Sequence, residues 1–330
     1  MDFPIDFVVT WVDGSNPEWQ EKKAKYTGAE VSDDPFYSEA RYREFGLFKY
    51  WFRAIEKNAP WVNKIFLVTD KQVPEFLNTA NSKLKIIDHS EIIDDKFLPT
   101  FNSSTIEMNL NKIPGLSEHF VYFNDDFYLA RATNPEDFFT PDGYAKDLVS
   151  QSVIMPIENY DHLLVNNVMA LNQNFSKREV MKLNFKNFFG PRQGFKMMIL
   201  NAILAIFPRF TRLFDGHTAF SIRKSDMDAA LLLINDKLEE AFLNKVRGLN
   251  DYSIQWVRYY QIAKGHSVSR RPSFSHTVQS SEPDLVEQFL KDSKVKILNI
   301  QDDMTMSNVD SARVVKVFEH EFGSKSSFEK

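Results

Sequence analysis

Acidic residues directly follow several predicted strands of this chain. Asp13 follows the first strand in WVDGS, Asp125 and Asp126 follow the fourth in FNDD, and Asp302 and Asp303 follow the last in NIQDD. In open α/β sheets, ligands bind beyond the carboxyl ends of the strands. Carboxylates gathered there repel one another unless a cation compensates them, and oxygen ligands suit Mg²⁺ or Mn²⁺, which in turn hold phosphates. The pattern therefore predicts a divalent cation site.

Each of these acids also has a plainer interpretation, as a turn residue or a helix N-cap. That interpretation suits a single Asp after a strand, and we apply it to Asp70, which follows the second strand in LVTD. The adjacent pair Asp125–Asp126 follows an apolar strand, and there we favour a functional role.

Arginine side chains supply the complementary charge. Arg41 and Arg43 lie in EARYREFG, and Arg247 and Arg258 lie in KVRGLNDYSIQWVRYYQ. The planar guanidinium binds phosphate bidentately and keeps its charge. The alternative for any one of these residues is a solvated helix face.

A histidine on a predicted loop is a candidate general base. His217 follows the turn-forming pair Asp215–Gly216, and imidazole exchanges protons near neutral pH. The alternative is a surface or packing histidine.

Apolar runs and helical stripes must position these side chains. We expect strands at residues 5–12, 64–69, 84–88, 119–123 and 294–300. We expect helices at 38–58, 75–81, 225–246, 251–264 and from about 311. Their alternation predicts an α/β fold, a mostly parallel sheet with flanking helices. We divide the chain into 1–164, the N-terminal part of the α/β catalytic domain, 165–214, a basic and apolar helical insertion or lid, and 215–330, which completes the domain.

Composition excludes several classes of protein. The 330 residues carry a net charge of -5, which argues against general nucleic-acid binding. With no cysteine, disulfides and Cys-ligated zinc cannot form. No signal peptide and no apolar run of bilayer length is visible, so we expect cytoplasmic residence. The phosphate-binding GxxxxGK[ST] loop, the GxGxxG fingerprint and the GxSxG elbow do not occur.

Four blocks of sequence resemble the Stealth family. They are IDFVVTWVDGSNPEW, the stretch from RYREFGLFKYWF to VYFNDDFYL, DGHTAFSIRKSDM together with KVRGLNDYSIQWVRYYQIAKG, and KVKILNIQDDM. The family includes bacterial capsular polysaccharide phosphotransferases and the animal enzyme that adds N-acetylglucosamine-1-phosphate to lysosomal glycoproteins. The resemblance implies a nucleotide-sugar transferase-like fold and transfer of a sugar-1-phosphate from a UDP-sugar donor to an acceptor saccharide hydroxyl, with release of UMP.

The resemblance also implies roles for individual residues. The carboxylates expected to hold Mg²⁺ (or Mn²⁺) on the diphosphate are Asp125, Asp126, Asp302 and Asp303. His217 would take the proton of the acceptor hydroxyl, Arg43 and Arg247 would stabilise the transferred phosphoryl group, and Asp251 would orient Arg247 or His217. The residues expected to contact the donor, its sugar or the shell of the metal are Asp13, Gly14, Ser15, Arg41, Asn102, Glu107 and Asn124.

Two other functions remain open at this stage. A metal-dependent glycosyltransferase would share the sheet, the carboxylates and the UDP-sugar, but it would release UDP. A catalytically silent saccharide-binding module would need neither His217 nor the clustered acids.

One segment indicates contact with lipid. Residues 197–207, MMILNAILAIF, lie between basic residues, and at eleven residues they are too few to span a bilayer but enough to dip into one. We expect residues 185–214 to rest on the inner face of the cell membrane or on a polyprenyl-lipid-linked acceptor. The alternative is a buried helix or a dimer interface.

Overall fold

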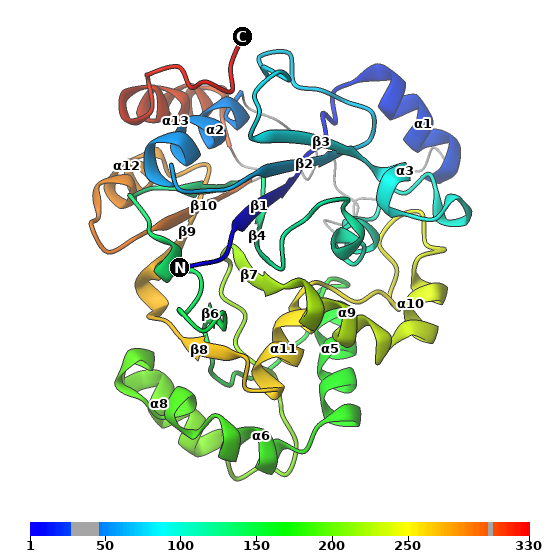
Figure 1. Ribbon diagram of the computed structural model, residues 1–330, viewed down its shortest axis with the longest axis vertical. Helices are drawn as coiled ribbons and strands as arrows, with labels where there is room; N and C mark the ends of the chain where they lie inside the picture. The colour runs from blue at the N-terminus through cyan, green and yellow to red at the C-terminus, as the bar shows by residue number, and fades with distance from the viewer. Residues whose placement is uncertain (28–45, 303–305) are drawn as a thin grey trace.

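A five-stranded sheet lies at the centre of the computed structural model, which describes residues 1–27, 46–302 and 306–330 (Figure 1). Its strand order is β3-β2-β1-β4-β7. The strands are β1 (Ile5–Thr10), β2 (Ile65–Thr69), β3 (Leu84–Asp88), β4 (His119–Asn124) and β7 (Phe220–Arg223). The first four are parallel, and β7 runs antiparallel to β4. The predicted α/β fold with a mostly parallel sheet is confirmed.

Two smaller sheets flank the central one. The first has the order β5-β10-β9, and the second pairs β6 with β8 in parallel. Their strands are β5 (Phe127–Leu129), β6 (Ala145–Asp147), β8 (Ser267–Ser269), β9 (Ser275–Gln279) and β10 (Ile297–Gln301). Because only Asp125 and Asp126 separate β4 from β5, these two acids lie at the junction between two sheets.

Helices cover both faces of the central sheet, as the alternation of buried side chains along β1 requires. Phe7 and Val9 face a core shared with α2, α12 and α13, whereas Val8 faces a core shared with α5, α9 and α11. These helices are α2 (Phe48–Asn58), α5 (Asp161–Asn174), α9 (Lys224–Leu232), α11 (Gln255–Ala263), α12 (Pro283–Lys291) and α13 (Asn308–Glu321). The other helices are α1 (Pro17–Thr27), α3 (His89–Ile92), α4 (Ser103–Glu107), α6 (Lys177–Leu183), α7 (Phe185–Phe188), α8 (Phe195–Leu204) and α10 (Asn235–Ala241).

Three of the predicted helices differ from the structure. Of the helix predicted over 38–58, residues 38–45 lie outside the described residues, and α2 begins only at Phe48. Residues 75–81 are not helical, because Leu77 bridges to Glu329 and the Asn78 amide donates to the Phe328 carbonyl, so the backbone bonds to the C-terminal tail instead. The helix predicted over 225–246 is interrupted and forms α9 and α10.

Helices α5 to α8 occupy most of residues 165–214, although α5 already begins at Asp161. In Figure 1, α6 and α8 lie at the end of the molecule opposite α13. The division of the chain at residues 164 and 214 stays a prediction. In the described part of the chain, no helix has the length and apolar character needed to cross a bilayer.

Candidate active site

The N-terminus of α4 ties the second sequence block to the third. Asn102 caps this helix, since its Oδ1 accepts a 3.0 Å hydrogen bond from the Ser104 amide. Its Nδ2 donates 2.6 Å to Asp251 Oδ2, which also accepts from the Gly248 amide at 2.9 Å. Burial raises the pKa of the Asp251 carboxyl, against the effect of these hydrogen bonds and of the Arg247 charge. Two residues predicted from separate blocks therefore form one buried cluster.

Arg247 enters the same cluster with part of its guanidinium unpaired. Its Nη2 donates 2.8 Å to Ser103 Oγ, and the group lies 5.5 Å from the ring centre of Tyr160. Within the described residues, its Nη1 is buried and has no hydrogen-bond partner. A buried cationic donor without a partner is costly to the free protein, and it suits an anionic ligand.

Glu107 and Tyr122 extend the cluster to the carboxyl ends of β1 and β4. The Tyr122 hydroxyl donates 3.3 Å to Glu107 Oε1 and lies 3.0 Å from Thr10 Oγ1. Burial raises the pKa of Glu107, and the nearby Arg247 charge opposes that rise. Burial chiefly raises the pKa of Tyr122 as well, and the charges of Glu107 and Asp125 add to it. The cluster therefore reaches the first of the paired acids.

Asp126 belongs to a second cluster, with His217 and Asn299. The His217 ring stands edge-on to the Phe127 ring, with 5.2 Å between ring centres. Burial raises the pKa of Asp126, and the neighbouring His217 and Asn299 oppose the rise. In the described residues, neither Asp126 Oδ1 nor Asn299 Oδ1 has a hydrogen-bond partner, although both are buried.

These two oxygens fit a hard cation, which prefers oxygen ligands. Asp302 lies two residues beyond Ile300, whose amide donates 3.0 Å to the Asp126 carbonyl. However, no three His, Asp or Glu side chains in the described part of the chain gather closely enough to hold an ion. The assignment of Asp125, Asp126 and Asp302 to a cation therefore stays a prediction, in which the bound diphosphate and water complete the shell of the ion.

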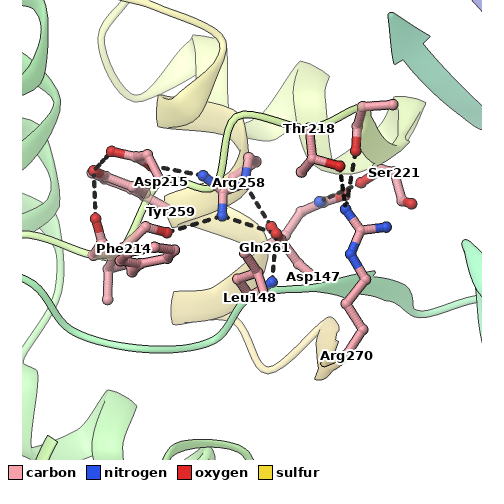
Figure 2. Close-up of polar contacts among 12 residues, drawn as sticks. Asp147, Leu148, Phe214, Asp215, Thr218, Ser221, Arg258, Tyr259, Gln261 and Arg270 are labelled. Carbon is pink, nitrogen blue, oxygen red and sulfur yellow. Dashed lines mark hydrogen bonds and ion pairs between the residues drawn. The ribbon is translucent and has the colours of Figure 1, made fainter. Parts of the chain in front are cut away.

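A buried arginine fixes the loop that carries His217 (Figure 2). Arg258 is fully buried and binds Asp147 bidentately, from Nε at 2.7 Å and Nη2 at 2.8 Å. Its Nη1 donates 2.7 Å to Asp215 Oδ1, and the Tyr259 hydroxyl donates 2.7 Å to Asp215 Oδ2. Burial works against ionisation of Asp147, but the Arg258 charge holds the pKa of that carboxyl below its usual range. The interpretation of Arg258 as a phosphate ligand is therefore wrong, since two carboxylates neutralise it.

The remaining predicted residues occupy separate positions. Asp13 Oδ1 accepts from the Ser15 amide and hydroxyl at 2.9 and 2.6 Å, which is the arrangement of a turn. The Gly14 carbonyl accepts from the Gln20 side chain at 2.9 Å. Asn124 ends β4, paired with Thr10 in the sheet register.

Asp70 forms an ion pair with Lys22 at 2.7 Å, in keeping with a structural role. The predicted residues Arg41, Arg43 and Asp303 lie outside the described residues.

Among the residues of these clusters that were not predicted from sequence are Tyr122, Asp147, Asn299 and Arg270. Burial lowers the pKa of Arg270 to about 10, and its Nη2 donates 3.1 Å to the Ala219 carbonyl, just beyond His217. Each of the four lies within or next to a strand. A polar residue among the apolar neighbours of a predicted strand is the sequence feature that could have identified them.

Two stretches of the chain match conserved regions of a known protein family. Residues 3–30 match conserved region 1 of the Stealth proteins, and residues 41–147 match conserved region 2. An exopolysaccharide phosphotransferase of Lactiplantibacillus plantarum is 43% identical over 99% of this chain and 97% of its own length. The chain belongs to the Stealth family. It is therefore a transferase, and Asp147, the partner of Arg258, is the last residue of the second conserved region.

Further relatives agree with this assignment. A receptor polysaccharide phosphotransferase of Streptococcus oralis is 37% identical over 98% of this chain and 99% of its own length. A capsular polysaccharide phosphotransferase of Streptococcus pneumoniae is 38% identical over 90% of both chains. Among solved structures, a galactosyltransferase in complex with donor and acceptor sugar analogues aligns with 96% of this chain and 95% of its own length. The sequence identity is 9% and the TM-score is 0.44.

Proposed function

We propose that this Stealth protein transfers a sugar-1-phosphate from a UDP-sugar to a saccharide hydroxyl, in the synthesis of a capsular or cell-surface polysaccharide. Full-length identity to phosphotransferases of polysaccharide synthesis supports the reaction type. The observation that carries the proposal is the guanidinium of Arg247, whose buried Nη1 has no hydrogen-bond partner among the described residues. The charge of Arg247 acts on Glu107, which accepts a hydrogen bond from Tyr122, and Tyr122 in turn lies within the field of Asp125 in the acidic turn. A diphosphate offers the anionic oxygens that Arg247 lacks.

In this reaction, the acceptor oxygen attacks the β-phosphorus of the donor. The new bond joins that oxygen to the β-phosphorus, and the bond that breaks joins the β-phosphorus to the bridging oxygen, which leaves with UMP. His217 takes the proton of the acceptor hydroxyl. Such a transfer depends on positioning and charge stabilisation rather than on a covalent enzyme intermediate. Arg247 stabilises the equatorial oxygens, in which charge develops.

Asp126, Asn299 and Asp302 would hold Mg²⁺ or Mn²⁺, with Asp125 and Asp303 as neighbouring carboxylates. The cation would neutralise the diphosphate when bound. Mg²⁺ commonly takes one or two carboxylates and completes its shell with substrate phosphates and water, so the two unpaired oxygens of the described site suffice as its protein anchor.

Donor recognition falls to residues around the ends of β1 and β4. We assign the nucleotide to Asp13, Gly14 and Ser15 and to Arg41, and the sugar to Asn102, Glu107 and Asn124. Arg43 would assist Arg247. We place the reaction in the cytoplasm, and we infer that the acceptor saccharide is carried on a polyprenyl lipid.

A donor panel labelled at the β-phosphate tests this proposal. The protein is incubated with each labelled UDP-sugar, Mg²⁺ and a saccharide acceptor, and the nucleotide and saccharide products are separated. We expect unlabelled UMP and a labelled phosphodiester. Labelled UDP would identify a glycosyltransferase instead, and no nucleotide release from any donor would favour a binding module. His217→Ala protein, purified identically, controls for contaminating hydrolases that release UMP.

A further inference from the structure

Exposed apolar side chains are concentrated in one part of this molecule. Eleven of the twenty large apolar residues that are exposed in the described chain lie between residues 153 and 207. Isolated exposed apolar residues are ordinary, but a concentration of them indicates a surface that meets a partner. Most of the eleven lie on or beside the helices α6, α7 and α8, at the end of the molecule opposite α13 (Figure 1).

Helix α8 presents its apolar face outward. Phe195, Ile199 and Ile203 recur every four residues, so they share one side of the helix, and they are 76%, 45% and 55% exposed. Ile206, just after the helix, is 79% exposed. The buried-helix alternative is therefore wrong for this side of α8.

The inner side of α8 is held by a polar residue. Asn201 is fully buried, and its Oδ1 accepts from the Gln151 amide at 2.7 Å and from Ser150 Oγ at 3.1 Å. Its Nδ2 donates 2.7 Å to the Phe188 carbonyl. These hydrogen bonds fix the rotation of the helix, so the outward direction of the isoleucines is determined by the fold.

Basic residues flank this apolar stripe along the chain. Between residues 177 and 209, the exposed lysines and arginines are Arg178, Lys182, Lys186, Arg192, Lys196 and Arg209, and Glu179 is the one acid in that stretch. The whole chain has a net charge of -5, so the positive charge of this region is opposite in sign to that of the protein as a whole. Arg209 also borders an apolar cavity of about 280 Å³, lined by Val165, Val168 and Met169, which offers room for a hydrocarbon chain.

We propose that the outer face of α8, defined by Phe195, Ile199, Ile203 and Ile206, docks on an anionic lipid bilayer. At ten residues, α8 is about 15 Å long and lies in the interface rather than across it. Its apolar side chains enter the headgroup boundary, and the surrounding basic residues bind the lipid phosphates. Binding to vesicles is measured without any transfer reaction, so a failure of this proposal can be distinguished from a failure of the reaction proposed above.

Vesicle flotation of the full chain tests the docking. At low salt, the protein should float with vesicles that contain phosphatidylglycerol. Added salt should dissociate it from these vesicles, and it should not bind vesicles of pure phosphatidylcholine. Replacing both Ile199 and Ile203 with Glu should reduce binding at least tenfold, since each loses apolar burial and adds a repelled charge. Replacing Arg192 and Lys196 with Gln should weaken binding about 25-fold, at roughly fivefold for each charge.

A matched variant separates docking from a general effect of new acids. Leu232 and Leu243 are 76% and 59% exposed and lie outside this region, so their replacement with Glu should leave vesicle binding unchanged. Circular dichroism and gel filtration confirm that each variant is folded. Wild-type protein that stays off anionic vesicles at low salt overturns the proposal. An equal loss of binding in the control variant also overturns it. A concentration-dependent dimer that the Ile199→Glu, Ile203→Glu change dissociates would overturn it too, because α8 would then contact a second copy of the chain.

Discussion

The guanidinium of Arg258 donates a 2.7 Å hydrogen bond to the carboxylate of Asp215, two residues before His217. The same guanidinium holds Asp147 at the end of β6. One side chain on α11 thereby fastens the His217 loop to a second strand, so the candidate base is attached to the core rather than to a free loop.

Replacing Arg258 with Leu should lower the free energy of unfolding by about 3–5 kcal/mol, because Asp147 and Asp215 would stay buried without a compensating charge. Urea denaturation measures the change. Arg192→Leu removes an exposed arginine and should alter stability by less than about 0.5 kcal/mol. A loss below about 1 kcal/mol for Arg258→Leu would mean that water reaches the two carboxylates.

Asp126→Asn should stabilise the metal-free protein at neutral pH by about 0.5–2 kcal/mol while abolishing transfer. Burial raises the pKa of Asp126, so the folded state holds this proton more tightly than the unfolded chain does. The stability that the carboxyl contributes is present at acid pH and is lost as pH rises through its folded pKa. The advantage of the variant should therefore vanish near pH 4 and grow toward neutrality. Thermal melts across that range, with chelator present, decide the sign.

Transfer should require a divalent cation. Added chelator should stop turnover, excess Mg²⁺ should restore it, and Asp302→Ala should reduce it strongly even with Mg²⁺ in excess. Asp70→Ala supplies the comparison, since Asp70 also follows a strand but is paired with Lys22, and it should keep its activity. Undiminished turnover in chelator would remove the cation from the reaction.

His217→Ala should lower kcat by roughly 10²–10⁴-fold, the usual contribution of a general base, and leave UDP-sugar binding nearly unchanged. A base that acts on the acceptor contributes to the transition state rather than to donor affinity. Calorimetric titration of the donor, paired with single-turnover rates, separates the two effects. His320→Ala, at an exposed position on α13, is the control. Weakened donor binding with an intact rate for bound donor would assign His217 to the donor instead.

Arg247→Lys should reduce kcat on the order of 10²-fold. Lysine keeps the charge, but it loses the planar fork in which Nη2 donates to Ser103 while Nη1 has no partner among the described residues. Arg178→Lys, on the exposed side of α6, should have no effect. A loss of only a few-fold at Arg247 would indicate a solvated side chain rather than a phosphate ligand.

The sequence foretold the central strands well, because β1 and β4 are apolar on both faces and leave little choice of structure. The antiparallel strand β7 was not predicted, since FSIR is short and its pairing with β4 depends on residues about a hundred positions earlier. Residues 75–81 were taken as a helix because local spacing does not show that the C-terminal tail will bind Leu77 and Asn78.

The sequence indicated which types of residue would form the candidate site, but it did not indicate which of them would be in contact. Asn102 and Asp251 were both chosen, yet the 2.6 Å hydrogen bond between them joins positions 149 residues apart. Arg258 was chosen for the right chemical reason, a bidentate fork, but its ligand is Asp147 rather than a phosphate. Which anion an arginine meets is decided by tertiary packing, and one sequence does not contain that information.

The separation in sequence between Asp147 and Arg258 also affects how the protein folds during its synthesis. The two residues are 111 positions apart, so at about 5–20 residues per second the ribosome needs roughly 5–20 s to supply the arginine after the aspartate. Until α11 emerges, Asp147 cannot be buried without an opposing charge, and β6 cannot settle beside β8. A fragment that ends at residue 147, where the second conserved region ends, should therefore remain unfolded and sensitive to protease, although it contains four of the five strands of the central sheet.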